Sequence, residues 1–174
     1  MIEYTEHVRF RETYYNVKEV MLSNCPEDQF IDGWRNMLEQ IQSRFYPDEA
    51  IKPWTEFNPD KDELCDPEDR RYPNPLFLVS LHYSNVEFTK ENWDHLIELV
   101  KEAWYCFEND DIFMDEGCDT LELYTGDWSG NEDIIEALYH TVFALYPHTL
   151  ERDRECPAVY RLKMPNLLRM LEND

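Results

Sequence analysis

Residues 121–138 read LELYTGDWSGNEDIIEAL and predict a strand, a tight turn and a helix in direct succession. Apolar and polar residues alternate up to Tyr124, as they do in a half-buried strand. Gly126 and Gly130 permit a tight turn, and Ser129 or Asn131 can cap the helix that follows. The apolar residues after the turn recur at helical spacing. This unit therefore sets a strand against a helix, as in folds that pack helices on a sheet.

Similar patterns before and after this unit complete the predicted fold. Thr89 begins a helix as its N-cap, and the apolar residues that follow form a broad stripe along it. Further strands are expected at residues 76–81, an apolar run of strand length, and at 158–164. A short helix ends the chain. The order strand–helix–strand–helix–strand within residues 76–174 predicts an α+β or α/β fold with a small mixed sheet of about three to four strands.

The N-terminal region, residues 1–47, is expected to be mainly helical. Pro26 opens a helix in which large apolar residues recur at helical spacing up to Phe45, and acidic residues in its first turn suit the positive end of the helix. In residues 1–10, apolar and polar side chains alternate, which favours a strand, whereas residues 14–22 favour a short helix. The length suits one compact domain overall.

The charge balance is the compositional feature that bears most on function. The 174 residues include 38 Asp and Glu against 16 Lys and Arg, a net charge of −22. Aromatic residues make up 14% of the chain, which disordered acidic chains lack, so we expect an ordered protein. This charge opposes direct binding to nucleic acid or to an anionic membrane. It favours a basic protein surface as the partner.

The cysteines and the N-terminus indicate where the protein works. The five cysteines are odd in number and widely scattered, which fits reduced thiols better than a disulfide framework. No secretory signal or membrane-length apolar run is visible in the sequence. We expect a cytoplasmic protein.

Two acidic stretches lack the periodic patterns of the predicted helices and strands. The first, residues 48–75, is rich in proline, lacks an apolar period and is expected to be a linker or a functional insertion; we call it the acidic segment. The second lies between the long helix and the strand near residue 121. An exposed aromatic residue ringed by carboxylates makes a good interface anchor. The predicted partner-contacting residues are Asp48, Glu49, Trp54, Glu56, Asp60, Asp62, Glu63, Asp66, Glu68, Asp69, Asp110, Asp111, Asp115, Glu116, Asp119 and Trp128.

The sequence contains no strong catalytic or metal-binding motif, so we expect no catalytic residue, metal or cofactor. A glycine loop before a helix can cradle an anion, but residues 126–131 lack an adjacent lysine and carry Asp127, which favours a turn with a cap. The histidines and cysteines form no spaced pair of zinc ligands. An enzyme or ligand-binding site would draw on this turn together with His82 or His140.

The turn also carries a resemblance. Residues 125–135, TGDWSGNEDII, resemble a strand–turn–helix unit of small uncharacterised phage and mobile-element proteins. Those proteins typically read TGGWSGNE, followed by an apolar helix, a basic stretch and a final strand. Here Arg152 and Arg154 correspond to the basic stretch, Asp127 replaces the second glycine, and no glycine pair precedes Tyr160. The resemblance covers about the last quarter of the chain and implies a phage-type origin and a small mixed fold, without an activity.

These observations favour a stoichiometric inhibitor that binds the cationic nucleic-acid-binding surface of a nuclease or defence complex. Carboxylates on a rigid surface can imitate the phosphates of a duplex. Phage anti-CRISPR and antirestriction proteins act in this way. One alternative is an immunity protein that neutralises a nuclease toxin, and another is a small enzyme or ligand-binding protein with a site near residues 126–131.

Overall fold

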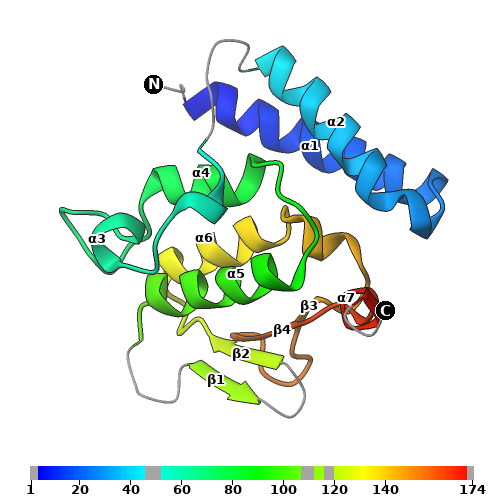
Figure 1. The fold of residues 1–174 in the computed structure, drawn as a ribbon. Coiled ribbons are helices and arrows are strands. Elements are labelled where there is room, and N and C mark those ends of the chain that lie inside the picture. The colour runs from blue at the N-terminus through cyan, green and yellow to red at the C-terminus, as the bar shows by residue number, and fades with distance from the viewer. Residues whose placement is uncertain (1–3, 46–51, 107–111, 116–119, 172–174) are drawn as a thin grey trace. The chain divides into compact units, whose positions relative to one another are not determined.

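The computed structural model describes residues 4–45, 52–106, 112–115 and 120–171. The chain divides into two compact units, Met1–Ile51 and Lys52–Asp174. The first unit is helical, and the second combines helices with one small sheet (Figure 1). The α+β class predicted from the sequence is therefore confirmed.

Two long helices form the first unit. α1 runs over Tyr4–Asn24, the 3-10 turn η1 over Glu27–Gln29 and α2 over Phe30–Phe45. α1 and α2 pack along one another as a hairpin (Figure 1). Trp34 Nε1 donates a hydrogen bond of 2.8 Å to the hydroxyl of Tyr14, and both side chains are buried. Burial raises the pKa of the Tyr14 hydroxyl well above its ordinary value.

Lys18 on α1 makes the stability of the chain depend on pH. Burial lowers the pKa of its ammonium group from 10.5 to about 8. Between these two values the unfolded chain binds more protons than the folded one, so this group makes the free energy of unfolding rise from pH 8 to pH 10.5. Below pH 8 the folded protein carries the cost of a buried charge.

We expect Lys18→Met to stabilise the protein at pH 7. One pKa unit is worth about 1.4 kcal/mol, and part of the side chain reaches solvent, so the expected gain is about 2 kcal/mol. Chemical denaturation at pH 7 and pH 10 measures the effect, and the advantage of the variant should shrink at pH 10. Lys101→Met removes an exposed lysine and serves as the control. An equal pH response of both variants would contradict the assignment to Lys18.

The described part of the second unit contains more helix than strand. In chain order the helices are η2 (Trp54–Glu56), α3 (Lys61–Leu64), α4 (Pro75–Tyr83), α5 (Lys90–Ala103), α6 (Ser129–Leu138), η3 (Val142–Leu145) and α7 (Asn166–Leu171). α5 and α6 lie over one face of the sheet, with α4 beyond α6 (Figure 1). Thr89 is the N-cap of α5, as predicted: its hydroxyl accepts a hydrogen bond of 3.1 Å from the Asn92 N–H.

The four described strands form one sheet in the order β1-β2-β4-β3, and every pairing is antiparallel. They are β1 (Ile112–Asp115), β2 (Thr120–Tyr124), β3 (Leu150–Arg152) and β4 (Val159–Lys163). The strands predicted around residues 121–124 and 158–164 are confirmed as β2 and β4. The buried residues on these two strands alternate with more exposed ones, because one face of the sheet packs against the helices.

The strand predicted at residues 76–81 is wrong, because this run lies inside helix α4. Asn74 caps the helix by accepting a hydrogen bond of 3.0 Å from the Leu76 N–H, and Pro75 occupies the first turn. Phe77 and Leu81 are fully buried. A short apolar run buried on several sides has the same pattern in a helix as in a central strand. The Asn-Pro pair was the available sign of a helix start.

Two further expectations differ from the structure, and two strands were missed. Residues 4–10 belong to helix α1, where packing along α2 overrides the local alternation that favoured a strand. The sheet is antiparallel throughout its described strands instead of mixed, because no described strand pair is joined by a parallel crossover. β1 and β3 were not predicted; at four and three residues they are too short to show a clear period.

Candidate functional site

The described part of the acidic segment, residues 52–75, belongs to the second unit and contains η2 and α3. Cys65 forms an isolated antiparallel bridge with Pro73, so the chain after α3 folds back on itself. The Asn74 N–H donates a hydrogen bond of 2.7 Å to the Leu64 carbonyl, which closes this loop. The segment is therefore a folded part of the second unit over residues 52–75.

Trp54 is part of the protein core. Its side chain is 1% exposed, and its ring packs near those of His95 and Phe143. An indole buried to this extent cannot reach a partner, so Trp54 is removed from the predicted contact residues. Its place in an acidic stretch made Trp54 a candidate interface anchor, but the indole anchors η2 to the body of the second unit.

Several acidic residues of the segment have structural roles at the start of α3. The Asp60 carboxylate accepts a hydrogen bond of 2.9 Å from the Asp62 N–H and so caps the helix. Glu63 accepts bonds from the backbone N–H and the side-chain amide of Asn58 at 3.0 and 3.1 Å. These bonds hold the pKa of the Glu63 carboxyl below its ordinary value. Asp62 pairs with Arg70.

The loop after α3 uses its carboxylates in the same way. Asp66 accepts a hydrogen bond of 2.8 Å from the Glu68 N–H. Asp69 accepts from the Nε atom and a terminal nitrogen of the Arg71 guanidinium at 2.8 and 2.7 Å, which lowers the pKa of Asp69. Many carboxylates predicted to contact a partner therefore also stabilise the fold of the segment.

Two carboxylates of the segment remain available for a partner. Glu56 and Glu68 are exposed, and neither carboxylate has a hydrogen-bond or ion-pair partner among the described residues. Residues 52–75 hold seven acidic residues against four basic ones, so the segment keeps a net negative charge.

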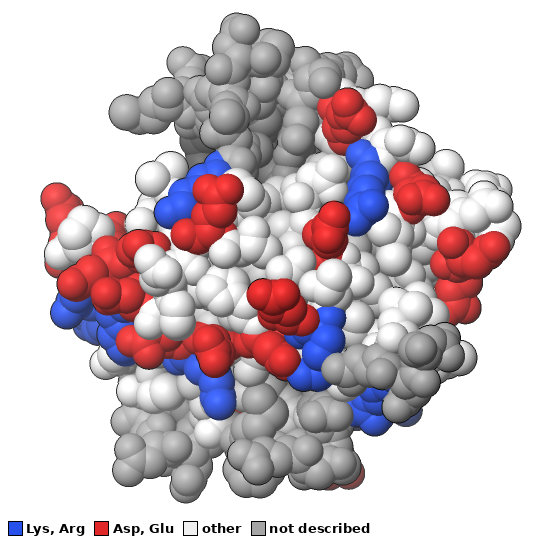
Figure 2. Space-filling model, in the orientation of Figure 1, with Lys and Arg blue, Asp and Glu red and all other residues white. Residues whose placement is uncertain are grey.

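Helix α5 adds a row of acidic residues that are not among the contact residues predicted from the sequence. Glu91, Asp94, Glu98 and Glu102 follow one another at intervals of three and four residues, which places them on one helical face about 4.5–6 Å apart along the axis. Asp94 pairs with Lys90 at 2.5 Å. We call these four residues the α5 row. α3 packs against α5, and Figure 2 shows carboxylates over this side of the unit with Lys and Arg among them.

The turn at residues 125–131 fastens the acidic segment to the body of the second unit. Gly126 and Asp127 both have positive φ, at 61° and 55°, which aims Trp128 at the loop after α3. Trp128 Nε1 donates a hydrogen bond of 2.9 Å to the Arg71 carbonyl, and the Trp128 ring lies 4.8 Å from that of Tyr72. The Arg71 guanidinium lies 5.4 Å from the Trp128 ring centre. The half-buried Trp128 thus serves first as a structural contact.

Asn131 joins the same turn to the chain that leaves α5. Its side-chain oxygen accepts from the Tyr105 N–H at 3.0 Å, and its amide nitrogen donates to the Tyr105 carbonyl at 2.8 Å. A longer bond of 3.4 Å reaches the Thr125 carbonyl. The side chain of Asn131 is 1% exposed. Asn131 thus holds three parts of the fold together.

The second acidic stretch lies mostly outside the described residues. Asp110, Asp111, Glu116 and Asp119, like Asp48 and Glu49, fall outside the described ranges, and for Asp115 the backbone alone is described, in strand β1. Their role as contact residues stays a prediction. Strand β1, which lies within the second acidic stretch in sequence, is at one edge of the sheet of described strands.

The histidines considered for an enzyme site lie together in the core. His82 and His140 are both buried, and their ring centroids are 4.8 Å apart. Within the described ranges no group of three or more His, Cys, Asp or Glu side chains is placed to hold a metal ion.

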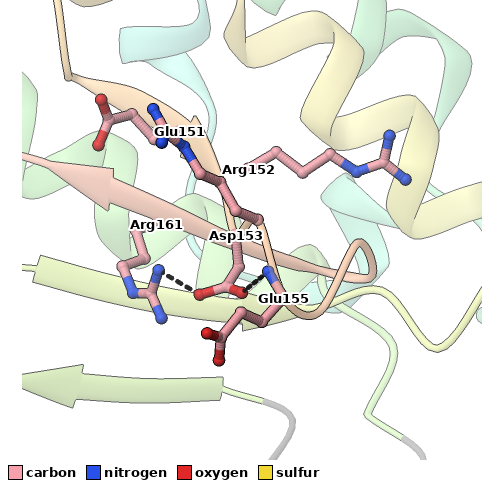
Figure 3. Close-up of a pocket in the computed structure, with 6 residues that line it drawn as sticks. Glu151, Arg152, Asp153, Glu155 and Arg161 are labelled. Carbon is pink, nitrogen blue, oxygen red and sulfur yellow. Dashed lines mark hydrogen bonds and ion pairs between the residues drawn. The ribbon is translucent and has the colours of Figure 1, made fainter.

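A surface hollow of about 530 Å³ lies where the chain turns between β3 and β4 (Figure 3). Three arginines and three acidic residues alternate around it, and the run Glu151–Glu155, ERDRE, was the sequence signal for it. Asp153 accepts from Arg161 at 2.7 Å and from the Glu155 and Cys156 N–H groups at 2.8 and 2.7 Å. These bonds lower the pKa of Asp153. Because three arginines and three acidic residues line it, the hollow presents no single sign of charge.

Comparisons with known proteins gave no match to a family model, a curated protein or a solved structure. No helix in the described part of the chain is long and apolar enough to cross a membrane. The candidate site is the acidic surface that consists of Glu56, Glu68 and the α5 row.

Proposed function

We propose that the protein is a stoichiometric inhibitor that binds the cationic nucleic-acid-binding surface of a nuclease or defence complex in the cytoplasm. The observation that carries this proposal is an ordered acidic surface on a chain of net charge −22. Glu56, Glu68, Glu91, Glu98 and Glu102 have no ion-pair partner among the described residues. A cationic partner would supply the charges that these carboxylates lack.

The geometry supports docking by charge more than a close copy of a duplex. The α5 row places one carboxylate about every 4.5–6 Å along its axis, whereas one strand of a duplex carries one phosphate about every 3.4 Å. Basic residues also interrupt the surface (Figure 2). We therefore expect fast, salt-sensitive association with a basic groove. The resemblance of residues 125–135 to phage proteins favours a phage inhibitor of a host defence enzyme.

The test is binding to a panel of purified nucleases that includes CRISPR effectors, restriction enzymes and toxin nucleases. We expect one of them to bind with an affinity that falls about tenfold or more between 50 and 300 mM NaCl, because salt screens exposed charges. The protein itself should not shift DNA or RNA in a gel. Binding that ignores salt, or no binding to any member of the panel, would count against the proposal. A toxin nuclease as the sole partner would favour the immunity alternative.

Charge reversal locates the contact surface. The double variant Glu56→Lys with Glu68→Lys should weaken binding about tenfold at low salt, since both carboxylates are exposed and unpaired in the described structure. Glu98→Lys with Glu102→Lys tests the α5 row in the same way.

The matched control is Glu151→Lys with Glu155→Lys, which changes the net charge equally but lies beside the hollow of Figure 3. It should weaken binding less than threefold, as expected of screened charges away from the interface. Isothermal titration calorimetry gives the three affinities. Equal losses in all three variants would mean that the attraction is diffuse and that no localised surface exists. Asp60, Glu63, Asp66 and Asp69 are left unchanged because they hold the segment together.

A further inference from the structure

Strand β1 lies at one edge of the sheet. It pairs antiparallel with β2 on one side, from Ile112 opposite Leu123 to Asp115 opposite Thr120. The sheet order β1-β2-β4-β3 leaves its other side without a partner strand in the described part of the second unit. An open edge offers backbone N–H and C=O groups to an additional strand.

The hydrogen bonds of the sheet show which residues of β4 direct their backbone groups toward β3 and which toward β2. The Lys163 N–H donates to the Thr149 carbonyl at 2.7 Å, and the Asp153 N–H donates to the Val159 carbonyl at 2.8 Å. The odd-numbered residues of β4 therefore bond toward β3. Successive residues of a strand direct their backbone groups to opposite sides, so the even-numbered residues of β4 bond toward β2.

The same alternation carries across to β1. The Thr125 N–H donates to the Ala158 carbonyl at 2.9 Å, so the odd-numbered residues of β2 bond toward β4. The even-numbered ones, such as Glu122, then bond toward β1, where Glu122 is opposite Phe113. It follows that the N–H and C=O groups of Ile112 and Met114 point to the open edge.

The sequence around this edge has one sign of charge. Residues 110–119 contain Asp110, Asp111, Asp115, Glu116 and Asp119 and no Lys or Arg. A second copy of the chain added at this edge would bring two such stretches together, and like charges across paired strands are destabilising. A basic strand at the same place would gain both backbone hydrogen bonds and charge pairing.

We propose that the open edge of β1 receives an extended, Lys- and Arg-rich segment of a basic protein, which adds to the sheet as a strand beside Ile112 and Met114. The inference rests on the proposed function for the nature of the partner, and it names the part of the partner that binds. The acidic surface of α5 and the acidic segment would then attract the partner, while the edge fixes its register.

The test uses two synthetic octapeptides of equal charge, one alternating Lys with Val and one alternating Lys with Pro. Amide exchange of the full chain is followed by NMR with each. We expect the Lys–Val peptide to slow exchange at Ile112 and Met114 about tenfold or more, because these N–H groups gain partners. Phe113, which already bonds toward β2, should change little. The Lys–Pro peptide lacks alternate N–H donors and should protect neither amide.

A matched pair of variants tests the same edge. Met114→Pro removes an outward N–H and should weaken binding of the Lys–Val peptide about tenfold, whereas Met114→Val keeps the N–H and should bind as the wild type does. If the proline variant does not fold, amide exchange of the wild type with the two peptides still tests whether the edge binds a strand.

Equal protection by both peptides, or unchanged exchange at Ile112 and Met114, would overturn the inference. Protection that grows with protein concentration without peptide would assign the edge to a second copy and also overturn it. Salt-sensitive nuclease binding without protection of the two amides refutes the edge and leaves the proposed function standing. Protection of the two amides by the peptide, without binding to any nuclease, supports the edge and refutes the proposed function.

Discussion

Replacing Asn131 with leucine is expected to lower the free energy of unfolding by about 3 kcal/mol, although the two side chains are similar in size. The Asn131 amide accepts from one backbone group of Tyr105 and donates to the other, and it is 1% exposed. Leucine leaves the N–H and the carbonyl of Tyr105 without these partners. An unpaired polar group away from water costs about 1–3 kcal/mol, and two such groups outweigh the added apolar burial.

Urea denaturation of Asn131→Leu measures this loss, with Ser129→Ala as the control on the same turn of α6. Ser129 is exposed, and no side chain caps the N-terminus of α6 with a hydrogen bond. Replacing Ser129 should therefore change the free energy of unfolding by less than about 0.5 kcal/mol. A loss for Asn131→Leu no larger than that of the control would show that solvent satisfies Tyr105. The bonds to Asn131 would then be incidental to the fold.

The sequence predicts the parts of this fold that have a clear period or cap. The apolar stripe of α5 and its Thr89 cap are visible in the sequence because a long helix repeats its pattern over several turns. β2 and β4 are visible because one face of each is buried. The run in α4 was mistaken for a strand because most residues of this helix are apolar. β1 and β3 escaped because a short edge strand carries too few residues to show an alternation.

The negative charge of the candidate site could be predicted from the sequence, but the individual residues that face solvent could not. Composition placed the acidic excess in residues 48–75 and 110–119, but a carboxylate that caps a helix looks the same in sequence as one that faces solvent. Asp60 and Glu63 belong to the first kind, and Glu56 and Glu68 to the second. Trp54 was misplaced for a related reason, since the partner of an indole is set by residues far away in the chain. The roles of Gly130 and Asn131 depend on contacts with residues 71–73 and 105, which are far away in the sequence. These roles could therefore not be predicted from the sequence.

Gly130→Ala is expected to cost about 3 kcal/mol and to loosen the acidic segment, although it adds a single methyl group. A Cβ atom at this position would lie 2.9 Å from Trp128 Nε1, 3.1 Å from the Arg71 carbonyl oxygen and 3.2 Å from Pro73 Cδ. The first two atoms are those of the hydrogen bond that fastens the segment. The methyl group therefore forces a backbone shift and the loss of that bond together.

Gly33→Ala is the matched control, because it is the same substitution in a helix where the nearest atoms belong to side chains and none to the backbone. A Cβ atom there would lie 3.2 Å from Met21 Sδ and 3.5 Å from Cys25 Sγ, both in side chains that can move. Alanine also favours a helix over glycine by about 1 kcal/mol, so stability should be unchanged or slightly raised.

Trypsin separates a local from a general effect of Gly130→Ala, since Arg70 and Arg71 are exposed cleavage sites within the fastened loop. Under native conditions we expect cleavage after these arginines to be about tenfold faster in Gly130→Ala than in the wild type, because local opening needs less free energy once the Trp128 bond is lost. Cleavage at Lys101 should accelerate less. If both sites accelerate equally, the methyl group destabilises the whole second unit, and the turn does not control the acidic segment. If neither does, Trp128 and Arg71 adjust without losing contact, and the tight approach at Gly130 has no role in holding the segment.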